Sequence, residues 1–211
     1  MSGNHSHTSD AGSGLRLGFF INTAFVVLEF AAGLLSNSLA LISDSVHNLT
    51  DSFSILLSFF ADKISKREAT AKQTFGYGRA AILAATINAT LLLVTSGFIF
   101  RESYDRLMNP QPVSGGIVII IAIVGILSNG AVAFAVSRNR HELNSRAIFV
   151  SNILDTLSSL GALIAGVIIL VTKQTWADPL ISFFIGCMLL YAAWEIMREA
   201  SNALLEGVPK G

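Results

Sequence analysis

The chain has 211 residues, of which 52% are hydrophobic and 13% are charged, against roughly 25% charged residues in an average soluble domain. This composition excludes a disordered chain and argues against an ordinary soluble enzyme. The 14 basic and 14 acidic residues give a net charge of zero, so no basic surface for nucleic acid is indicated. The single cysteine, Cys187, excludes an internal disulfide. The composition predicts an integral membrane protein.

The polar segment 1–14 is expected to be a flexible tail, with no charged region or cleavage site of a signal peptide before the first apolar run. From residue 15 onward, apolar runs alternate with polar loops, and each run reaches roughly the 20 residues that a membrane span needs. We therefore expect an all-α membrane domain over 15–205, followed by a linker at 206–211. Its six predicted spans are 15–36, 39–61, 80–103, 114–137, 147–172 and 178–203.

The distribution of basic residues predicts the orientation of these spans. Six spans place both chain ends on one side, and the loops and tails of that side carry 11 of the 14 Lys and Arg residues. The opposite side carries only Arg101, Arg106 and Lys173. Because basic residues are enriched in cytoplasmic loops, we expect both termini to lie in the cytoplasm. The protein is then a multi-pass protein of the inner or plasma membrane.

Four acidic residues and one histidine fall well inside the predicted spans. They are Glu29, Asp44, Asp51, Asp155 and His47. A charge near the bilayer centre costs several kcal/mol on insertion scales, so such groups usually face the interior of a bundle and serve function. No lysine or arginine lies deep in a span to neutralise them, which favours a bound cation as their partner.

The second predicted span carries a stripe of polar residues. Asp44, His47 and Asp51 are three or four residues apart, so they lie on one face of a helix over two turns. Imidazole nitrogen combined with carboxylate oxygen suits zinc and similar divalent ions. This spacing predicts metal ligands on one helix face.

The fifth predicted span carries a parallel pattern, with Ser151, Asn152 and Asp155 matching the H-N-x-x-D of His47 to Asp51 as S-N-x-x-D. Ser151 and Asp155 share a face, and Asn152 lies about 100° away from it. The two spans run in opposite directions, so the polar groups of both can meet near the membrane midplane. Together they supply four ligand positions, and the fourth is Ser151 or a water molecule that Ser151 holds.

Structural alternatives exist for two of these acidic residues. An intramembrane Asp155 can pair with a neighbouring side chain or with backbone groups. Glu29, in the first span, can be a secondary site, a proton carrier or the partner in a structural hydrogen bond.

Several motifs, in this order, resemble the cation diffusion facilitator family of divalent metal/proton antiporters, and especially its zinc-exporting bacterial members. They are LLSNSLALISDSVHNLTDS, TFGYGRAAILAATIN, NSRAIFVSNILDTLSSLGA, ADPLIS and NALLEGVP. The resemblance covers essentially the whole chain after residue 15. It implies a six-helix membrane bundle that works as a homodimer in the lipid bilayer.

The resemblance implies a metal site made of His47, Asp51, Ser151 and Asp155. The family most often has histidine where this chain has Ser151, and this difference favours oxygen-preferring ions such as manganese(II) or iron(II) beside zinc, with cobalt and cadmium also open. The family also suggests a charge pair near the cytoplasmic surface, at Arg79 and Glu206.

A second difference from the family concerns length. Members usually continue into a small cytosolic domain, which is either truncated or absent here, since the sequence stops at Gly211.

We therefore expect export of a divalent cation, with zinc favoured, in exchange for protons, and no cofactor beyond these ions. No covalent step and no Walker-type nucleotide loop is predicted, so the protein is not expected to be an enzyme. The alternative is a transport-silent partner subunit of a metal transporter, suggested by the missing ligand at Ser151. A passive channel is disfavoured because few charges lie deep in the spans.

Overall fold

The computed structural model describes residues 7–65, 80–137 and 143–205 of the chain. In these ranges the chain forms six α-helices and no strand, which confirms the predicted all-α fold. The helices are α1 (His7–Ser36), α2 (Leu39–Ser65), α3 (Ala80–Met108), α4 (Gly115–Ser137), α5 (Leu143–Thr172) and α6 (Ala177–Leu204). Each predicted span falls on one of these helices.

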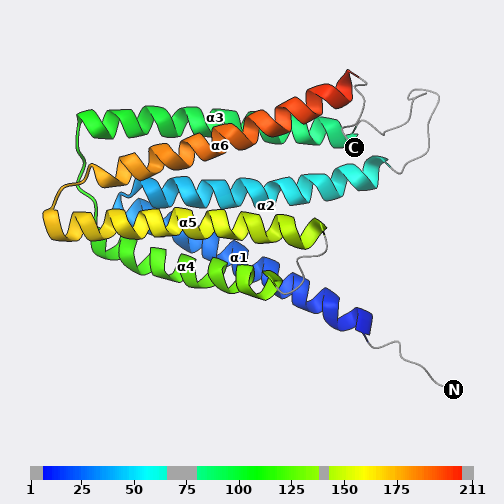
Figure 1. The fold of residues 1–211 in the computed structure, drawn as a ribbon, viewed down its shortest axis with the longest axis horizontal. Helices are drawn as coiled ribbons and strands as arrows, with labels where there is room; N and C mark the ends of the chain where they lie inside the picture. Colours follow the sequence, from blue (N-terminus) through cyan, green and yellow to red (C-terminus); the bar gives the residue numbers. More distant parts are fainter. Residues whose placement is uncertain (1–6, 66–79, 138–142, 206–211) are drawn as a thin grey trace.

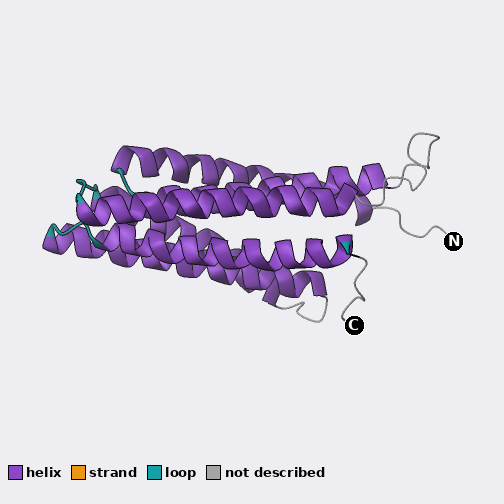
Figure 2. Cartoon of the chain, turned by 90° about the horizontal axis from the view of Figure 1, so that it is seen from above, coloured by secondary structure: helices purple, strands orange, loops and turns teal. Residues whose placement is uncertain are grey.

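Successive helices run in opposite directions, so the start of α1 and the end of α6 lie at the same end of an elongated bundle (Figure 1). The opposite end carries the short segments 37–38, 109–114 and 173–176, and is called the far end below. Figure 2 shows these segments as loops at one end of long, nearly parallel helices. The most extensive packing is between α4 and α5 and between α3 and α6.

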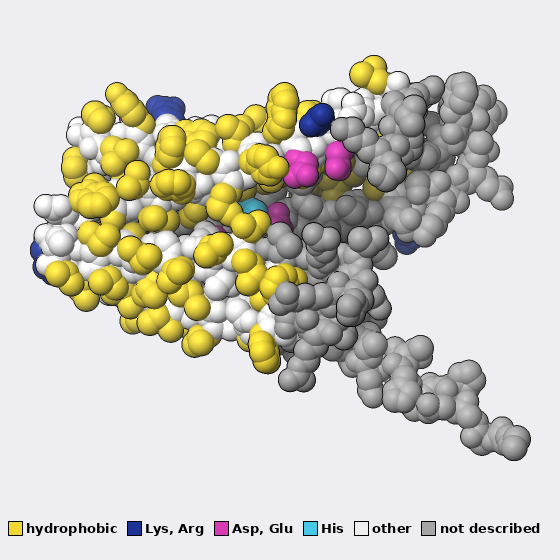
Figure 3. All heavy atoms as spheres, in the orientation of Figure 1, with side chains coloured by type: hydrophobic (Ala, Val, Ile, Leu, Met, Phe, Trp, Pro, Cys, Tyr) yellow, Lys and Arg dark blue, Asp and Glu magenta, His cyan; other side chains and the backbone are white. Residues whose placement is uncertain are grey.

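On the face shown in Figure 3, apolar side chains cover most of the surface of the described helices. Within the described residues, four helices are long and apolar enough to cross a membrane, over Ala80–Met108, Gly115–Phe134, Ser151–Thr172 and Ala177–Leu204, and α1 adds a shorter apolar stretch, Asn22–Ser36. Large apolar side chains such as Leu35, Phe134 and Val171 are exposed. Water would make this surface prone to aggregation, whereas lipid acyl chains solvate it, so the surface fits a membrane protein.

Two buried apolar clusters hold the helices together. One joins α1, α2, α4 and α5 through small and branched residues such as Ala40, Leu41, Val118 and Ala162. The other joins α3 to α6 around Leu92 and Leu189. Helix α2 contacts α1, α3, α5 and α6, and therefore lies between the two clusters. Polar groups in the first half of α2, such as Ser43 and Asp44, are therefore surrounded by protein.

Helices α4 and α5 approach each other backbone to backbone at two glycines. A Cβ atom at Gly115 would lie 2.7 Å from the carbonyl oxygen of Gly166, and one at Gly166 would lie 2.9 Å from the Ile119 side chain. Small residues allow this close packing, on which helix association in lipid depends. At these two glycines the backbones of α4 and α5 are in close contact.

The first turn of α2 is capped by a carboxylate from α6. Asp178 accepts hydrogen bonds from the Ser38 hydroxyl (2.5 Å) and from the backbone N–H groups of Leu39 (2.7 Å) and Ala40 (3.3 Å). The Ser38 hydroxyl oxygen also accepts a bond from the N–H of Leu41. The first N–H groups of a helix lack partners within the helix, and their positive dipole end favours an anion. Asp178 is completely buried, so the bond between the two helices is shielded from water.

The turn between α1 and α2 is fastened by α3 as well. Asn37 adopts a positive φ of 53°, a conformation that asparagine tolerates better than most residues. The Arg106 guanidinium donates to the Asn37 carbonyl and side-chain oxygens, at 2.6 and 3.1 Å. The Asn37 amide donates to the Pro112 carbonyl at 3.0 Å. At the far end, α2 is therefore fixed to α3, α6 and the α3–α4 segment.

Replacing Asp178 by alanine is expected to destabilise the bundle, because it leaves buried N–H groups of α2 without an acceptor. The expected loss is about 2–3 kcal/mol of unfolding free energy. Asp105→Ala is the matched control, because Asp105 is exposed and its ion pair with Arg101 is long, at 3.9 Å, and open to solvent. Unfolding of the purified protein in mixed detergent micelles measures both variants, and an equal effect of the two would contradict the capping role.

Candidate metal site

The predicted ligands lie where α2 passes α5. His47 and Asp51 are one turn apart on α2, and Ser151 and Asp155 are one turn apart on α5. Residues four apart in a helix share a face, so each pair presents its side chains in one direction. The helices α2 and α5 are in contact, and His47 of α2 faces Asp155 of α5.

The His47 imidazole lies between two carboxylates. Its Nδ1 is 3.9 Å from Oδ1 of Asp51, and its Nε2 is 3.7 Å from Oδ1 of Asp155. Both distances are too long for direct hydrogen bonds. Nδ1 of His47 and Oδ1 of Asp155 have no hydrogen-bond partner in the part of the chain that the structure describes, although both atoms are buried. Buried polar atoms normally find a partner, so these two are available to a ligand.

These separations are close to those of a metal site. Two atoms bound to one tetrahedral zinc ion at roughly 2.1 Å are about 3.4 Å apart. However, the two carboxylates contact opposite nitrogens of the ring, and one ion can bind only one of these nitrogens. Accordingly, no three His, Cys, Asp or Glu side chains within the described ranges already form a group that could hold an ion. A single ion bound by His47 and both carboxylates would therefore require one of these side chains to move.

Exposure increases along α2 from Asp44 to Asp51. Asp44 is buried, the His47 side chain is 17% exposed and the Asp51 side chain is 43% exposed. On α5 the Asp155 side chain is only 11% exposed. The polar stripe is therefore closed on the side of Asp44 and opens towards the C-terminal half of α2.

The remaining predicted ligand positions are less buried. Ser151 and Asn152 on α5 are both half-buried. The Asn152 backbone carbonyl accepts a bond from the Thr156 hydroxyl within the helix. The predicted charge pair of Arg79 and Glu206 lies outside the described residues.

Glu29 and Asp44 form a second polar contact, between α1 and α2. Their carboxyl groups are in side-chain contact, and each residue is only 1% exposed. Asn48 donates to Glu29 at 3.5 Å, and the Ser159 hydroxyl of α5 donates to Asp44 at 3.5 Å. The sequence marked both acids as unusual but offered no sign that they meet, because helical spacing says nothing about contacts between different helices.

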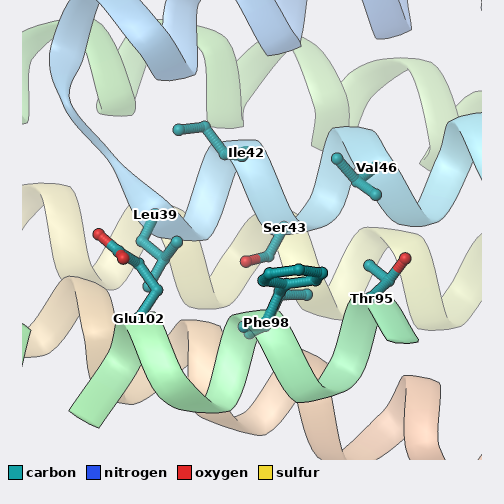
Figure 4. Close-up of a pocket in the computed structure, with 8 residues that line it drawn as sticks. Leu39, Ile42, Ser43, Val46, Thr95, Phe98 and Glu102 are labelled. Carbon is teal, nitrogen blue, oxygen red and sulfur yellow. The ribbon is translucent and has the colours of Figure 1, made fainter. Parts of the chain in front are cut away.

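A pocket of about 360 Å³ lies between α2 and α3 (Figure 4). Its lining residues are Leu39, Ile42, Ser43 and Val46 on α2, and Thr95, Phe98, Ile99 and Glu102 on α3. The lining is mainly apolar, and its one carboxylate, Glu102, hydrogen-bonds to Arg106. This pocket therefore lacks the chemistry of a metal site.

Comparison with known proteins places this arrangement in a family. The sequence pattern of the cation efflux transmembrane domain matches residues 15–205. The chain belongs to the cation diffusion facilitator family. The match covers all six helices, including the stretches of α2 and α5 on which the candidate ligands lie.

Among its relatives is the zinc transporter ZitB of Pectobacterium atrosepticum, which is 41% identical over 99% of this chain and 66% of that protein. ZitB of Escherichia coli is 37% identical over 99% of this chain and 69% of its own length. The cadmium, cobalt and zinc/H(+)-K(+) antiporter of Bacillus subtilis is 33% identical over 98% of this chain and 68% of its own length. The chain thus spans about two thirds of the length of these relatives.

Proposed function

We propose that this protein exports divalent metal cations across a membrane, with zinc as the favoured substrate and manganese, iron(II), cobalt and cadmium as further candidates. The observation that carries the proposal is the His47 imidazole held between Asp51 and Asp155, from two helices of an apolar bundle. Relatives named as zinc transporters and as a cadmium, cobalt and zinc antiporter support the same function. Ser151 is proposed as the fourth position, supplying its hydroxyl or a bound water.

Proton exchange follows from the chemistry of the proposed ligands. A metal binds imidazole and carboxylate only in their deprotonated forms, so protons and metal compete for one site. Metal entering from the cytoplasm displaces protons, and protons entering from the other side displace the metal. This competition produces exchange without a separate proton path.

Alternating access requires the site to open to one side at a time. The increase in exposure towards Asp51 supports an opening along the C-terminal half of α2. The buried bonds of Asp178 with Ser38 and Leu39 support a closed far end. We propose that release of the metal involves movement of the α2–α5 contact relative to the other helices.

The orientation and assembly are part of the same proposal. We propose a multi-pass protein of the inner or plasma membrane with both chain ends in the cytoplasm. The excess of basic residues on that side supports this orientation. A homodimer is proposed from the family resemblance.

The transport proposal is tested in proteoliposomes that contain a pH-sensitive dye. Adding zinc, manganese, iron(II), cobalt or cadmium should move protons across the membrane of vesicles with wild-type protein. Asp51→Ala and Asp155→Ala should reduce this signal to the level of protein-free vesicles, because each removes a charged ligand from an apolar interior. Glu195→Gln, on an exposed face of α6, is the matched control. Unchanged transport by either alanine variant would refute the site assignment.

Metal selectivity should change when Ser151 is replaced by histidine. Imidazole binds zinc better than a hydroxyl does, so Ser151→His should raise the rate for zinc relative to that for manganese. The ratio of initial rates in the same vesicles measures the shift, and Thr156→His, one turn further along α5 and off this face, controls for the added ring. A lower zinc-to-manganese ratio in Ser151→His would show that the serine is not at a ligand position.

The second candidate function is a transport-silent subunit that binds and modulates another metal transporter. The serine in place of the family's usual histidine favours it. This candidate predicts that the purified chain alone moves no protons with any of the five metals, and that Ser151→His alone gains activity. Transport by the wild-type chain excludes it.

A further inference from the structure

We propose that the apolar pocket between α2 and α3 binds one acyl chain of a phospholipid whose headgroup carries a primary ammonium group, such as phosphatidylethanolamine. The lipid comes from the membrane leaflet at the far end, with its ammonium group at Glu102 and its phosphate at Arg101. This site is separate from the candidate metal site, and the proposal does not rest on the proposed function.

The pocket has the shape of a groove along the helix axes. Its lining residues on α2 and on α3 both follow the spacing i, i+3, i+4 and i+7. Residues at this spacing share one helix face over two turns, so the groove is about 10 Å long. Figure 4 shows Leu39 and Glu102 at one end of the groove, and Val46 and Thr95 at the other. Because the helices cross the membrane, the groove runs in the direction that acyl chains take in a bilayer.

The groove is apolar along most of its length and opens at the surface of the bundle. Phe98, which Figure 4 shows midway along it, is 67% exposed. The exposed surface of a membrane-spanning bundle meets lipid hydrocarbon. Atoms that line an empty groove lose dispersion contacts on one side, and the volume of about 360 Å³ is within the roughly 300–1,000 Å³ of ligand pockets. An acyl chain therefore suits both the walls and the opening.

The charged end of the groove lies at the level of the lipid headgroups. Helix α3 has 29 residues, so its length of about 44 Å matches the roughly 40–45 Å of a bilayer with its headgroups. The hydrocarbon core of roughly 30 Å leaves about 7 Å of the helix at each end. Glu102 lies about 9 Å from the helix end at Met108. It is therefore close to the boundary between headgroups and hydrocarbon, and the rest of the groove extends into the hydrocarbon.

Two charged side chains at this end match a zwitterionic headgroup. The Glu102 side chain is 49% exposed, and its Oε1 accepts a bond from Arg106 at 2.9 Å. Its Oε2 completes no hydrogen bond within the described residues, so this oxygen is available to a donor from outside the protein. Arg101 is 80% exposed, and its contact with Asp105 is long, at 3.9 Å. The carboxylate suits an ammonium group and the guanidinium suits a phosphate.

The headgroup, and not the tail, selects the lipid. Lipid tails are as apolar as the groove, so an acyl chain gains no hydrophobic free energy by leaving the bilayer for it. A primary ammonium group can donate a hydrogen bond to the Glu102 carboxylate, whereas the quaternary ammonium of choline has no N–H to donate. A headgroup with a net negative charge is repelled by the same carboxylate. The groove therefore distinguishes phospholipids that have identical tails.

Headgroup selectivity is tested by native mass spectrometry of the purified chain in detergent. The chain is titrated with phosphatidylethanolamine, phosphatidylcholine or phosphatidylglycerol of identical acyl chains. The wild-type chain should bind the first phosphatidylethanolamine about fivefold more tightly than either other lipid, as expected for one exposed ion pair. Glu102→Gln keeps an acceptor for Arg106 but removes the charge, so it should abolish this preference.

Asp105→Asn is the matched control for Glu102→Gln, because it makes the same change of charge at the same end of α3, outside the groove. It should keep the preference for phosphatidylethanolamine. Equal wild-type affinities for the three lipids, or tighter binding of phosphatidylglycerol, would overturn the proposal. A preference that persists in Glu102→Gln would overturn it as well.

Occupation of the groove is tested with Thr95→Phe, which places a ring at the end of the groove opposite Glu102. This variant should lower the affinity for phosphatidylethanolamine several-fold, because the acyl chain loses contacts with both walls. Thr90→Phe makes the same change at an exposed position of α3 outside the groove and should bind the lipid as the wild type does. Thermal unfolding checks the fold of both variants, and Glu102→Gln alone decides if Thr95→Phe does not fold. Equal affinities of the two folded phenylalanine variants would contradict the groove as the site.

A second copy of this chain is the competing occupant, and the same spectra detect it from the mass of the protein. A changed proportion of dimer in Thr95→Phe, at unchanged affinity for phosphatidylethanolamine, would assign the groove to an interface between copies and overturn the proposal. Lipid binding is measured without metal, so a failure of zinc transport leaves this inference standing. Equal binding of all three lipids leaves the proposed function standing.

Discussion

The constraint on which the structure depends is negative charge placed inside an apolar helix bundle without basic side chains to neutralise it. Asp44, Asp51 and Asp155 share the interior with one imidazole, and the ion pairs found in the described part of the chain give them no lysine or arginine. Such an arrangement is costly unless cations or protons occupy it. The stability of the bundle would therefore depend on the protons or cations that occupy this polar interior.

Helix α2 bears most of this constraint because it lies between the two apolar clusters. At its first turn it is fixed by Asp178 of α6 and, through Asn37, by Arg106 of α3. Halfway along, it contacts α1 through acidic and amide groups and α5 through the imidazole. The strong bonds hold one end of the helix, whereas the middle is held by long, weak polar contacts that an arriving ion can rearrange. This difference in strength is what a movement of the α2–α5 contact needs.

Much of this architecture could be predicted from the sequence. The apolar runs located all six helices, and the spacing of His47 and Asp51 put them on one face, where the structure has their side chains 3.9 Å apart. The matching pattern at Asp155 predicted that α5 would meet α2. Both inferences rest on periodicity within one helix and on the alternating direction of successive spans.

Contacts between helices distant in sequence could not be predicted in this way. Asp178 lies at the start of a span, where a loop or interface role was as plausible as the capping of α2. Glu29 and Asp44 each stood out as an acid in an apolar run, but their contact depends on how α1 rotates against α2. The position of the imidazole between the two carboxylates, with a different nitrogen facing each, likewise depends on side-chain packing. Spacing along the chain contains none of this information.

The backbone contact between Gly115 and Gly166 also has a consequence for biogenesis. Helices α4 and α5 are consecutive, so both are available to each other before α6 has been synthesised. A helical hairpin that closes without intervening lipid can enter the bilayer as a preassembled unit, and a side chain as small as a methyl group at either glycine would hinder that closure. Helix α5, which carries the proposed ligand Asp155, would then reach the membrane already supported on one side, before its polar face meets α2.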